Sequence, residues 1–142
     1  MSQAPKAEAG QDLAGVRVLI VEDDFIIFMG MEATLLEAGA EVAYCRSLTE
    51  AQDFLAPIPK PAEERMAGIL DVRLDGETSL PLAPELRARE IPFLFYSAQG
   101  DLEKIRAECP GCLVIAKPSP PRLLLSTLAG LLDKAGKATP AD

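Results

Sequence analysis

The sequence predicts an α/β fold in which five parallel strands alternate with five helices, the (βα)5 pattern of a doubly wound sheet. Short apolar runs without polar alternation, such as residues 16–21, 66–70 and 112–116, are typical of strands buried on both faces. A helical segment follows each predicted strand, and this alternation implies right-handed crossovers with helices on both faces of the sheet. These three apolar runs are followed by charged residues, so we expect the charges to meet at one edge of the sheet.

The individual elements follow from the apolar runs and from the residues that start and stop helices. The expected strands are residues 16–21, 41–44, 66–70, 92–96 and 113–116. The expected helices are residues 25–38, 48–55, 80–89, 101–108 and 120–134. Asp24 and Ser47 are placed to cap the first two helices, and Gly39 is placed to end the first. Residues 73–77 are expected to form a loop.

One domain accounts for most of the chain. At 142 residues the chain is large enough to bury a sizeable core. No internal repeat with a period of about 20 to 50 residues is visible. We expect the domain to cover residues 15–136, with a flexible lead-in at 1–14 and a flexible tail at 137–142.

The composition excludes several classes of function. The chain has 14 basic and 22 acidic residues, for a formal net charge of −8, which argues against binding nucleic acid or anionic membranes. No apolar run approaches the roughly 20 residues that span a bilayer, and no signal core is present, so we expect a cytoplasmic protein. Histidine is absent, so a phosphoryl group that arrives from a histidine must come from a partner.

The three cysteines do not predict a disulfide framework. Cys109 and Cys112 form a C-x-x-C pair, but the pair follows a helix and opens a strand, the reverse of the thioredoxin arrangement. A zinc site would need two further ligands, which the sequence does not offer. We expect a turn with incidental thiols and rank a redox role below it.

Charged or hydroxyl side chains follow four of the five predicted strands. Glu22 and Asp23 follow the first strand, Asp71 the third, Ser97 ends the run of the fourth, and Lys117 follows the fifth. Crowded carboxylates have raised pKa values unless a cation relieves them, and oxygen ligands suit Mg²⁺. The ammonium of Lys117 and the hydroxyl of Ser97 are both suited to contact phosphoryl oxygens.

Together these groups are the parts needed to form an aspartyl phosphate. Asp71 is the expected nucleophile, because it stands alone at the end of the central strand, and Glu22 and Asp23 are better placed to carry the metal. Any one of these residues alone would be structural more often than functional. Their combination at four strand ends favours the functional interpretation.

The chain resembles the receiver domain of two-component response regulators over roughly residues 15–135. The matching motifs are LIVEDD at 19–24, ILDVRL at 69–74, FYSA at 95–98 and AKP at 116–118. The resemblance implies a flavodoxin-like receiver fold with strand order 2-1-3-4-5. It also implies that the protein is a phosphoacceptor rather than an enzyme, one that catalyses only its own Mg²⁺-dependent phosphorylation and dephosphorylation.

The resemblance also implies a role for each matching residue. Asp71 would be the phosphoacceptor, Ser97 the switch hydroxyl and Lys117 the lysine that pairs with the phosphoryl group. The implied Mg²⁺ ligands are Glu22, Asp23, Asp71 and the backbone carbonyl of Arg73. Arg73 and Gln99 flank the expected phosphoryl position and are candidates for tuning its lifetime; two solvated loop side chains are the alternative.

Two departures from the receiver pattern are visible. Asp75 stands where receivers usually carry proline, and Val114 replaces the aromatic switch residue three positions before the lysine. Both departures resemble the pattern of an atypical alphaproteobacterial subgroup, the FAT GUY receivers. Residues 95–99 of this chain match in part the motif that names the subgroup. That resemblance implies a stand-alone receiver working with kinases of the HWE or a related class.

The expected partners are a histidine kinase or a histidine phosphotransfer protein, together with an output protein that the sequence does not identify. The predicted first helix carries more apolar residues than one buried stripe needs, and the surplus would suit a kinase helix bundle. We expect a monomer or a weak homodimer.

Three alternatives remain open at this point: a degenerate receiver that acts as a phosphorylation-independent binding module, a phosphate sink, and a haloacid-dehalogenase-type hydrolase. The last needs an acid/base aspartate two residues after its nucleophile, where this chain has Arg73.

Overall fold

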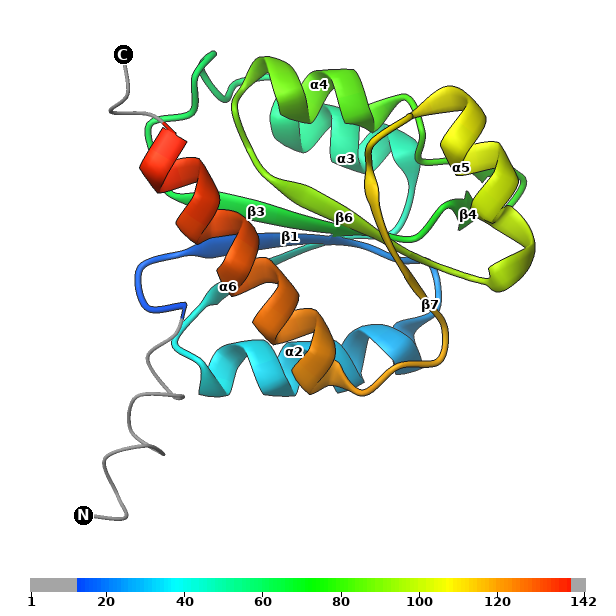
Figure 1. Ribbon diagram of the computed structural model, residues 1–142, viewed down its shortest axis with the longest axis horizontal. Helices are drawn as coiled ribbons and strands as arrows, with labels where there is room; N and C mark the ends of the chain where they lie inside the picture. The colour runs from blue at the N-terminus through cyan, green and yellow to red at the C-terminus, as the bar shows by residue number, and fades with distance from the viewer. Residues whose placement is uncertain (1–12, 139–142) are drawn as a thin grey trace.

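Five parallel strands form one sheet in the computed structural model, which describes residues 13–138 (Figure 1). The strands are β1 (Arg17–Val21), β2 (Glu41–Cys45), β3 (Met66–Leu70), β6 (Phe93–Ser97) and β7 (Leu113–Ala116). Their order across the sheet is β2-β1-β3-β6-β7, and every neighbouring pair is parallel. Numbered among themselves along the chain, the strands therefore lie in the order 2-1-3-4-5, which confirms the predicted flavodoxin-like fold.

Helices cover both faces of this sheet, as the alternating pattern predicts. The helices are α2 (Phe25–Glu37), α3 (Leu48–Leu55), α4 (Leu82–Ala88), α5 (Leu102–Glu108) and α6 (Pro121–Ala138). Helices α2 and α6 lie on one face, and α3, α4 and α5 lie on the other (Figure 1). Two buried clusters result, one on each face, and the central strand β3 is buried along its whole length.

The predicted helix caps are confirmed. Asp24 Oδ1 accepts a hydrogen bond from the amide of Ile26 at 2.9 Å, and Ser47 Oγ accepts from the amide of Glu50 at 3.1 Å. Gly39 follows the end of α2 with φ +93°, a backbone conformation that glycine adopts without strain.

The predicted loop at 73–77 is wrong, because this segment forms a small hairpin. Strand β4 (Arg73–Leu74) pairs antiparallel with β5 (Glu77–Thr78). Asp75 and Gly76 connect them with φ values of 43° and 90°. An Asp-Gly pair in this conformation is a favoured two-residue hairpin turn, so the sequence carried a turn signal that the loop prediction missed.

Several helix bounds also differ from the prediction. Helix α4 begins at Leu82 and ends at Ala88, and α5 is preceded by a short 3-10 turn at Gln99–Asp101. Helix α6 extends four residues past the predicted end at 134 and reaches Ala138. These shifts of a few residues leave the order of the elements unchanged.

Leu13 belongs to the packed domain, although the prediction placed it in the lead-in. Its side chain is fully buried, and its amide donates to the carbonyl of Ala38 at 2.9 Å. Residues 1–12 and 139–142 lie outside the described residues, so the predicted lead-in and tail otherwise stay predictions. Between residues 13 and 138, no helix is long and apolar enough to cross a membrane.

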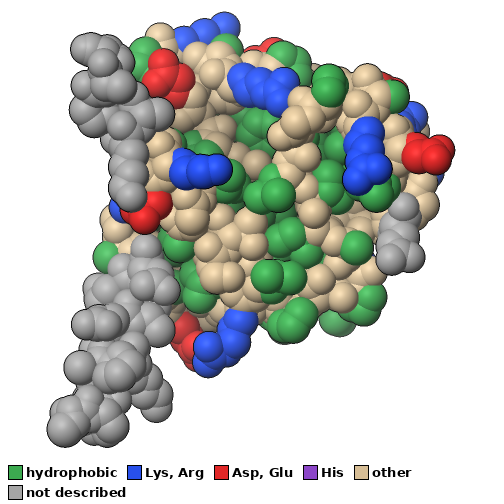
Figure 2. Space-filling view, in the orientation of Figure 1, with side chains coloured by type: hydrophobic (Ala, Val, Ile, Leu, Met, Phe, Trp, Pro, Cys, Tyr) green, Lys and Arg blue, Asp and Glu red, His purple; other side chains and the backbone are tan. Residues whose placement is uncertain are grey.

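Apolar side chains are also present at the surface. Figure 2 shows hydrophobic side chains gathered over the middle of the face that carries α6, with lysine and arginine side chains around them. Large apolar residues that are at least two-fifths exposed include Leu113 on β7 and Leu123 on α6. The acidic residues considered next lie at the carboxyl ends of the strands.

Candidate functional site

Three carboxylates meet at the carboxyl edge of the sheet. Glu22 and Asp23 follow β1, Asp71 follows β3, and each offers a carboxylate oxygen within 4.8 Å of the others. The in-register pairing of Val21 with Leu70 brings the ends of these two strands together. Glu22 is 1% exposed and Asp71 is 8% exposed, so two of the three carboxylates are withdrawn from bulk water.

Lys117 supplies the positive charge of this cluster from the end of β7. Its Nζ lies 3.2 Å from Glu22 Oε1 and 3.2 Å from Asp71 Oδ2. Its backbone amide donates to the carbonyl of Ser97 at 2.8 Å, which ties the β7 end to β6. The structure therefore brings together four of the sequence-predicted site residues: Glu22, Asp23, Asp71 and Lys117.

The ring of Tyr96 lies beside Lys117, a contact that the sequence does not predict. The Lys117 Nζ lies 5.5 Å from the centre of the Tyr96 ring, within cation–π range. The Tyr96 hydroxyl donates to the carbonyl of Ser119 at 3.1 Å and accepts from the Ser119 amide at 3.0 Å. The tyrosine thus fixes the loop that follows Lys117.

The pKa values in the cluster reflect a surplus of negative charge. Burial, reinforced by the charge of Asp71, raises the pKa of Glu22 from 4.5 to about 7. Burial also raises the pKa of Asp71, although Lys117 partly offsets this. Burial alone would lower the pKa of Lys117, but the carboxylates of Asp71 and Glu22 outweigh it and raise that pKa.

This donor set fits a hard divalent cation. Three carboxylates share one ammonium, so burial destabilises the negative charge of at least one of the two buried carboxylates, Glu22 and Asp71. Oxygen ligands of this kind suit Mg²⁺, which is bound through one or two carboxylates while keeping several waters.

Ser97 and Arg73 contact a residue that sequence reasoning missed. Ser97 Oγ donates to Asp101 Oδ2 at 2.8 Å, and Arg73 Nε donates to Asp101 Oδ1 at 2.7 Å. In the sequence Asp101 was only the first residue of a predicted helix. An acidic residue four positions after the strand-end serine was the available signal, but it does not reveal which way the side chain turns. The side chain of Gln99 lies outside the described residues.

Ser79 is a second residue that the sequence did not single out. It is fully buried, and its Oγ donates to the backbone carbonyl of Asp71 at 2.5 Å. Its amide donates to the carbonyl of Val72 at 2.9 Å. The serine after the hairpin therefore holds the backbone that carries Asp71.

Helix α2 carries exposed apolar side chains in its first turns. Phe25, Ile26 and Met29 are 51%, 76% and 49% exposed. Phe25 follows directly on the acidic run 22–24, so α2 begins next to the acidic cluster.

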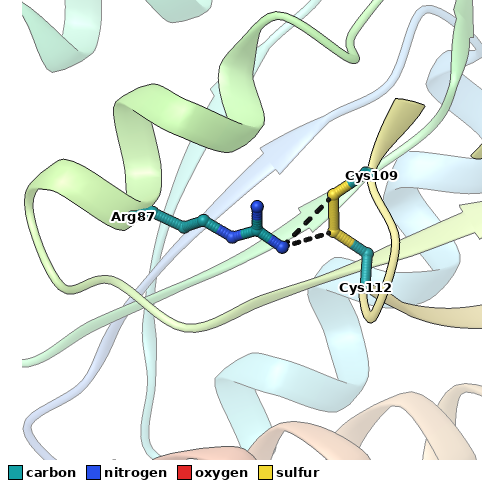
Figure 3. Close-up of a disulfide and its surroundings, with 3 residues drawn as sticks. All are labelled: Arg87, Cys109 and Cys112. Atoms are coloured by element: carbon teal, nitrogen blue, oxygen red, sulfur yellow. Dashed lines mark hydrogen bonds between the residues drawn. A yellow bond between two sulfur atoms is a disulfide. The ribbon is translucent and has the colours of Figure 1, made fainter.

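Cys109 and Cys112 form a disulfide, which corrects the expectation of incidental free thiols (Figure 3). Gly111, with φ +86°, lies in the turn between them, and their Cα atoms are 5.7 Å apart. Arg87 Nη2 contacts both sulfurs, at 3.5 Å for Cys109 and 3.2 Å for Cys112. Cys112 precedes β7 whereas Lys117 follows it, so the disulfide lies at the opposite end of this strand from the acidic cluster.

The chain is similar to known regulators and receivers. No family model matches the chain. The transcriptional regulatory protein AruR of Pseudomonas aeruginosa is 31% identical over 125 residues, which cover 86% of this chain and 51% of AruR. The chain spans about half the length of the curated relatives it matches.

Two solved structures share the fold over nearly their whole length. A response regulator receiver protein from Sinorhizobium medicae superposes with a TM-score of 0.73 at 22% identity, covering 85% of this chain and 97% of that one. A protein described as a response regulator from Chloroflexus aurantiacus superposes with a TM-score of 0.68 at 30% identity, covering 82% of this chain and 97% of that one. Because fold and sequence agree over almost all of such a relative, the chain belongs to the receiver-domain family of response regulators.

Proposed function

We propose that this receiver domain accepts a phosphoryl group on Asp71 from a histidine kinase or a histidine phosphotransfer protein and signals through protein–protein contacts. The observation that carries the proposal is the position of Lys117 Nζ, 3.2 Å from both Asp71 and Glu22, inside a cluster of three carboxylates. A buried carboxylate beside an ammonium and a cation site has the groups that phosphoryl transfer needs.

Each residue has a defined part in the proposed transfer. A carboxylate oxygen of Asp71 attacks the phosphorus of the donor, the phosphorus–nitrogen bond to the partner's histidine breaks, and the electron pair leaves with the imidazole. Lys117 then pairs with an oxygen of the phosphoryl group, and Ser97 donates its hydroxyl to another.

Glu22, Asp23, Asp71 and the backbone carbonyl of Arg73 are the proposed Mg²⁺ ligands. When bound, the cation neutralises charge that spreads over the phosphoryl oxygens. Arg73, whose side chain is 71% exposed, and Gln99 stay candidates for tuning the phosphoryl lifetime.

The partner surface that we propose is the exposed start of α2. Phe25 and Ile26 present apolar surface beside the acidic cluster, where a kinase helix bundle that delivers a phosphohistidine would dock. Four finer points stay predictions: membership of the FAT GUY subgroup, a kinase of the HWE or a related class, a stand-alone receiver in the cytoplasm, and a monomeric or weakly dimeric state.

The proposal is tested by incubating the protein with Mg²⁺ and a small-molecule acyl phosphate, then measuring its intact mass. We expect one phosphate on the wild type, none without Mg²⁺ and none on Asp71→Asn. The asparagine variant keeps the shape of the side chain, so its fold is checked by circular dichroism.

If the wild type takes no phosphate, beryllofluoride binding separates two explanations. Binding at Asp71 would indicate a phosphate sink whose adduct hydrolyses too fast to trap. Absence of both the adduct and beryllofluoride binding would contradict the proposal and favour the binding module.

A further inference from the structure

Asp101 is a buried carboxylate that two other segments hold. It is 2% exposed, and it ends the 3-10 turn between β6 and α5. Ser97 Oγ donates to its Oδ2 at 2.8 Å from the end of β6, and Arg73 Nε donates to its Oδ1 at 2.7 Å from the hairpin after Asp71. One side chain therefore fastens the hairpin to the start of α5.

The carboxylate of Asp101 is turned away from its own helix. Asp101 occupies the N-cap position of α5 but makes no capping hydrogen bond with its side chain. Asp24, before α2, has an extended backbone with ψ 107° and accepts from the amides of Ile26 and Ile27. Asp101 instead has a helical backbone with ψ −3°, because it ends the 3-10 turn that runs into α5. Its carboxylate is therefore directed to Ser97 and Arg73 rather than to its own helix.

The hydroxyl of Ser97 cannot serve two acceptors at once. A serine carries one O–H donor, and in this structure the Ser97 hydroxyl donates to Asp101. Ser97 ends β6, whose partner β3 runs directly into Asp71, and the two strands pair in register at Leu70 and Phe95. A phosphoryl group on Asp71 only accepts hydrogen bonds, so it competes with Asp101 for the same proton.

We propose that Ser97, Asp101 and Arg73 form a latch that phosphorylation of Asp71 opens; this rests on the proposed function. The phosphoryl group takes the Ser97 hydroxyl, and the buried Asp101 carboxylate loses one of its two side-chain donors. Because this one side chain fastens both segments, its rearrangement loosens Arg73 and the hairpin β4–β5. The moving parts are the hairpin and the 99–108 segment, which form the surface that reports phosphorylation.

The latch predicts a direction for the change in the rate of Asp71 phosphorylation that a purely structural role does not predict. The latched state withholds the Ser97 hydroxyl from the incoming phosphoryl group, so weakening the latch speeds phosphorylation of Asp71. Asp101→Asn replaces a charge-assisted hydrogen bond by a neutral one of roughly half the strength, and we expect labelling by an acyl phosphate to become about threefold to tenfold faster. Loss of a structural support would slow labelling or leave its rate unchanged.

The experiment combines labelling rates from intact mass with hydrogen–deuterium exchange of peptides covering residues 73–78 and 99–108. In the wild type, exchange in both peptides rises on phosphorylation, because the hairpin and the start of α5 separate. In Asp101→Asn, exchange is already raised before labelling and changes little afterwards. Glu103→Gln is the matched control: it removes an exposed charge in the first turn of the same helix and behaves as the wild type.

A second variant covers the case in which Asp101→Asn does not fold. Arg73→Gln changes a side chain that is 71% exposed, and exchange at residues 73–78 should be as fast before labelling as after it.

The outcomes separate the latch from the proposed function. A wild type that is labelled at Asp71 while exchange in both peptides stays constant overturns the latch and leaves the function intact. Slower labelling of Asp101→Asn overturns it as well. A wild type that takes neither phosphate nor beryllofluoride overturns both.

Discussion

Two charge clusters lie near the same edge of the sheet, and they differ in balance. In the first, Lys117 stands between Glu22 and Asp71, with Asp23 beside them, so three carboxylates share one ammonium. In the second, Asp101 stands between the guanidinium of Arg73 and the hydroxyl of Ser97, so one carboxylate has one cation and one further donor.

The difference in charge balance distinguishes a candidate cation-binding site from a structural contact between loops. The Lys117 cluster holds more negative than positive charge away from water, and this destabilises the ionised carboxylates, as the raised pKa values of Glu22 and Asp71 indicate. Binding of a cation or protonation of a carboxylate would remove this destabilisation. The Asp101 cluster has its charge matched and needs no ligand, so it responds only when a competitor takes one of its donors.

The largest expected effect comes from removing the ammonium of the first cluster. Lys117→Met leaves Glu22 and Asp71 without their cation, and we expect the free energy of unfolding to fall by about 2 kcal/mol near pH 7 without metal. Protonation of Glu22 limits the loss. Urea unfolding measures it, and added Mg²⁺ should restore part of the stability in the variant. Equal stability of variant and wild type would contradict the imbalance.

The next effect is a dependence of stability on pH. The folded-state pKa of Glu22 is raised from 4.5 to about 7, so the folded protein binds more protons than the unfolded chain between these values. The contribution of Glu22 to stability is therefore greatest at low pH and is lost as the pH rises toward 7, by at least about 1 kcal/mol. Urea unfolding across this range measures it.

Two conditions sharpen the pH experiment. Saturating Mg²⁺ should flatten the dependence, and Glu22→Gln should remove most of it. Stability that rises steadily from pH 5 to pH 7 in the metal-free wild type would argue that Glu22 is not a strained carboxylate.

The smallest effects belong to the second cluster and differ between its two donors. Ser97→Ala removes a buried donor, and we expect the free energy of unfolding to fall by about 1 kcal/mol. Arg73→Gln changes an exposed side chain and should cost about 0.5 kcal/mol or less. Urea unfolding of both variants checks the order, and a larger loss for Arg73→Gln would show that the ion pair rather than the hydroxyl holds the loop.

The sequence by itself determined the sheet and the placement of four site residues. Apolar runs mark the strands, and residues directly after parallel strands must meet at one edge, so Glu22, Asp23, Asp71 and Lys117 came together as their spacing predicted. Asp24 and Ser47 were equally predictable, since a cap depends on a few adjacent residues.

Tertiary structure alone decided where side chains between the strand ends turn. Asp101 was expected only to begin a helix, yet its carboxylate faces Ser97 and Arg73, the latter 28 residues away in the sequence. The Ser79 hydroxyl donates to the carbonyl of Asp71, and the amide of Leu13 donates to the carbonyl of Ala38. Such contacts depend on which loops the folded sheet brings together, and a local pattern of residues does not encode which partner each group meets.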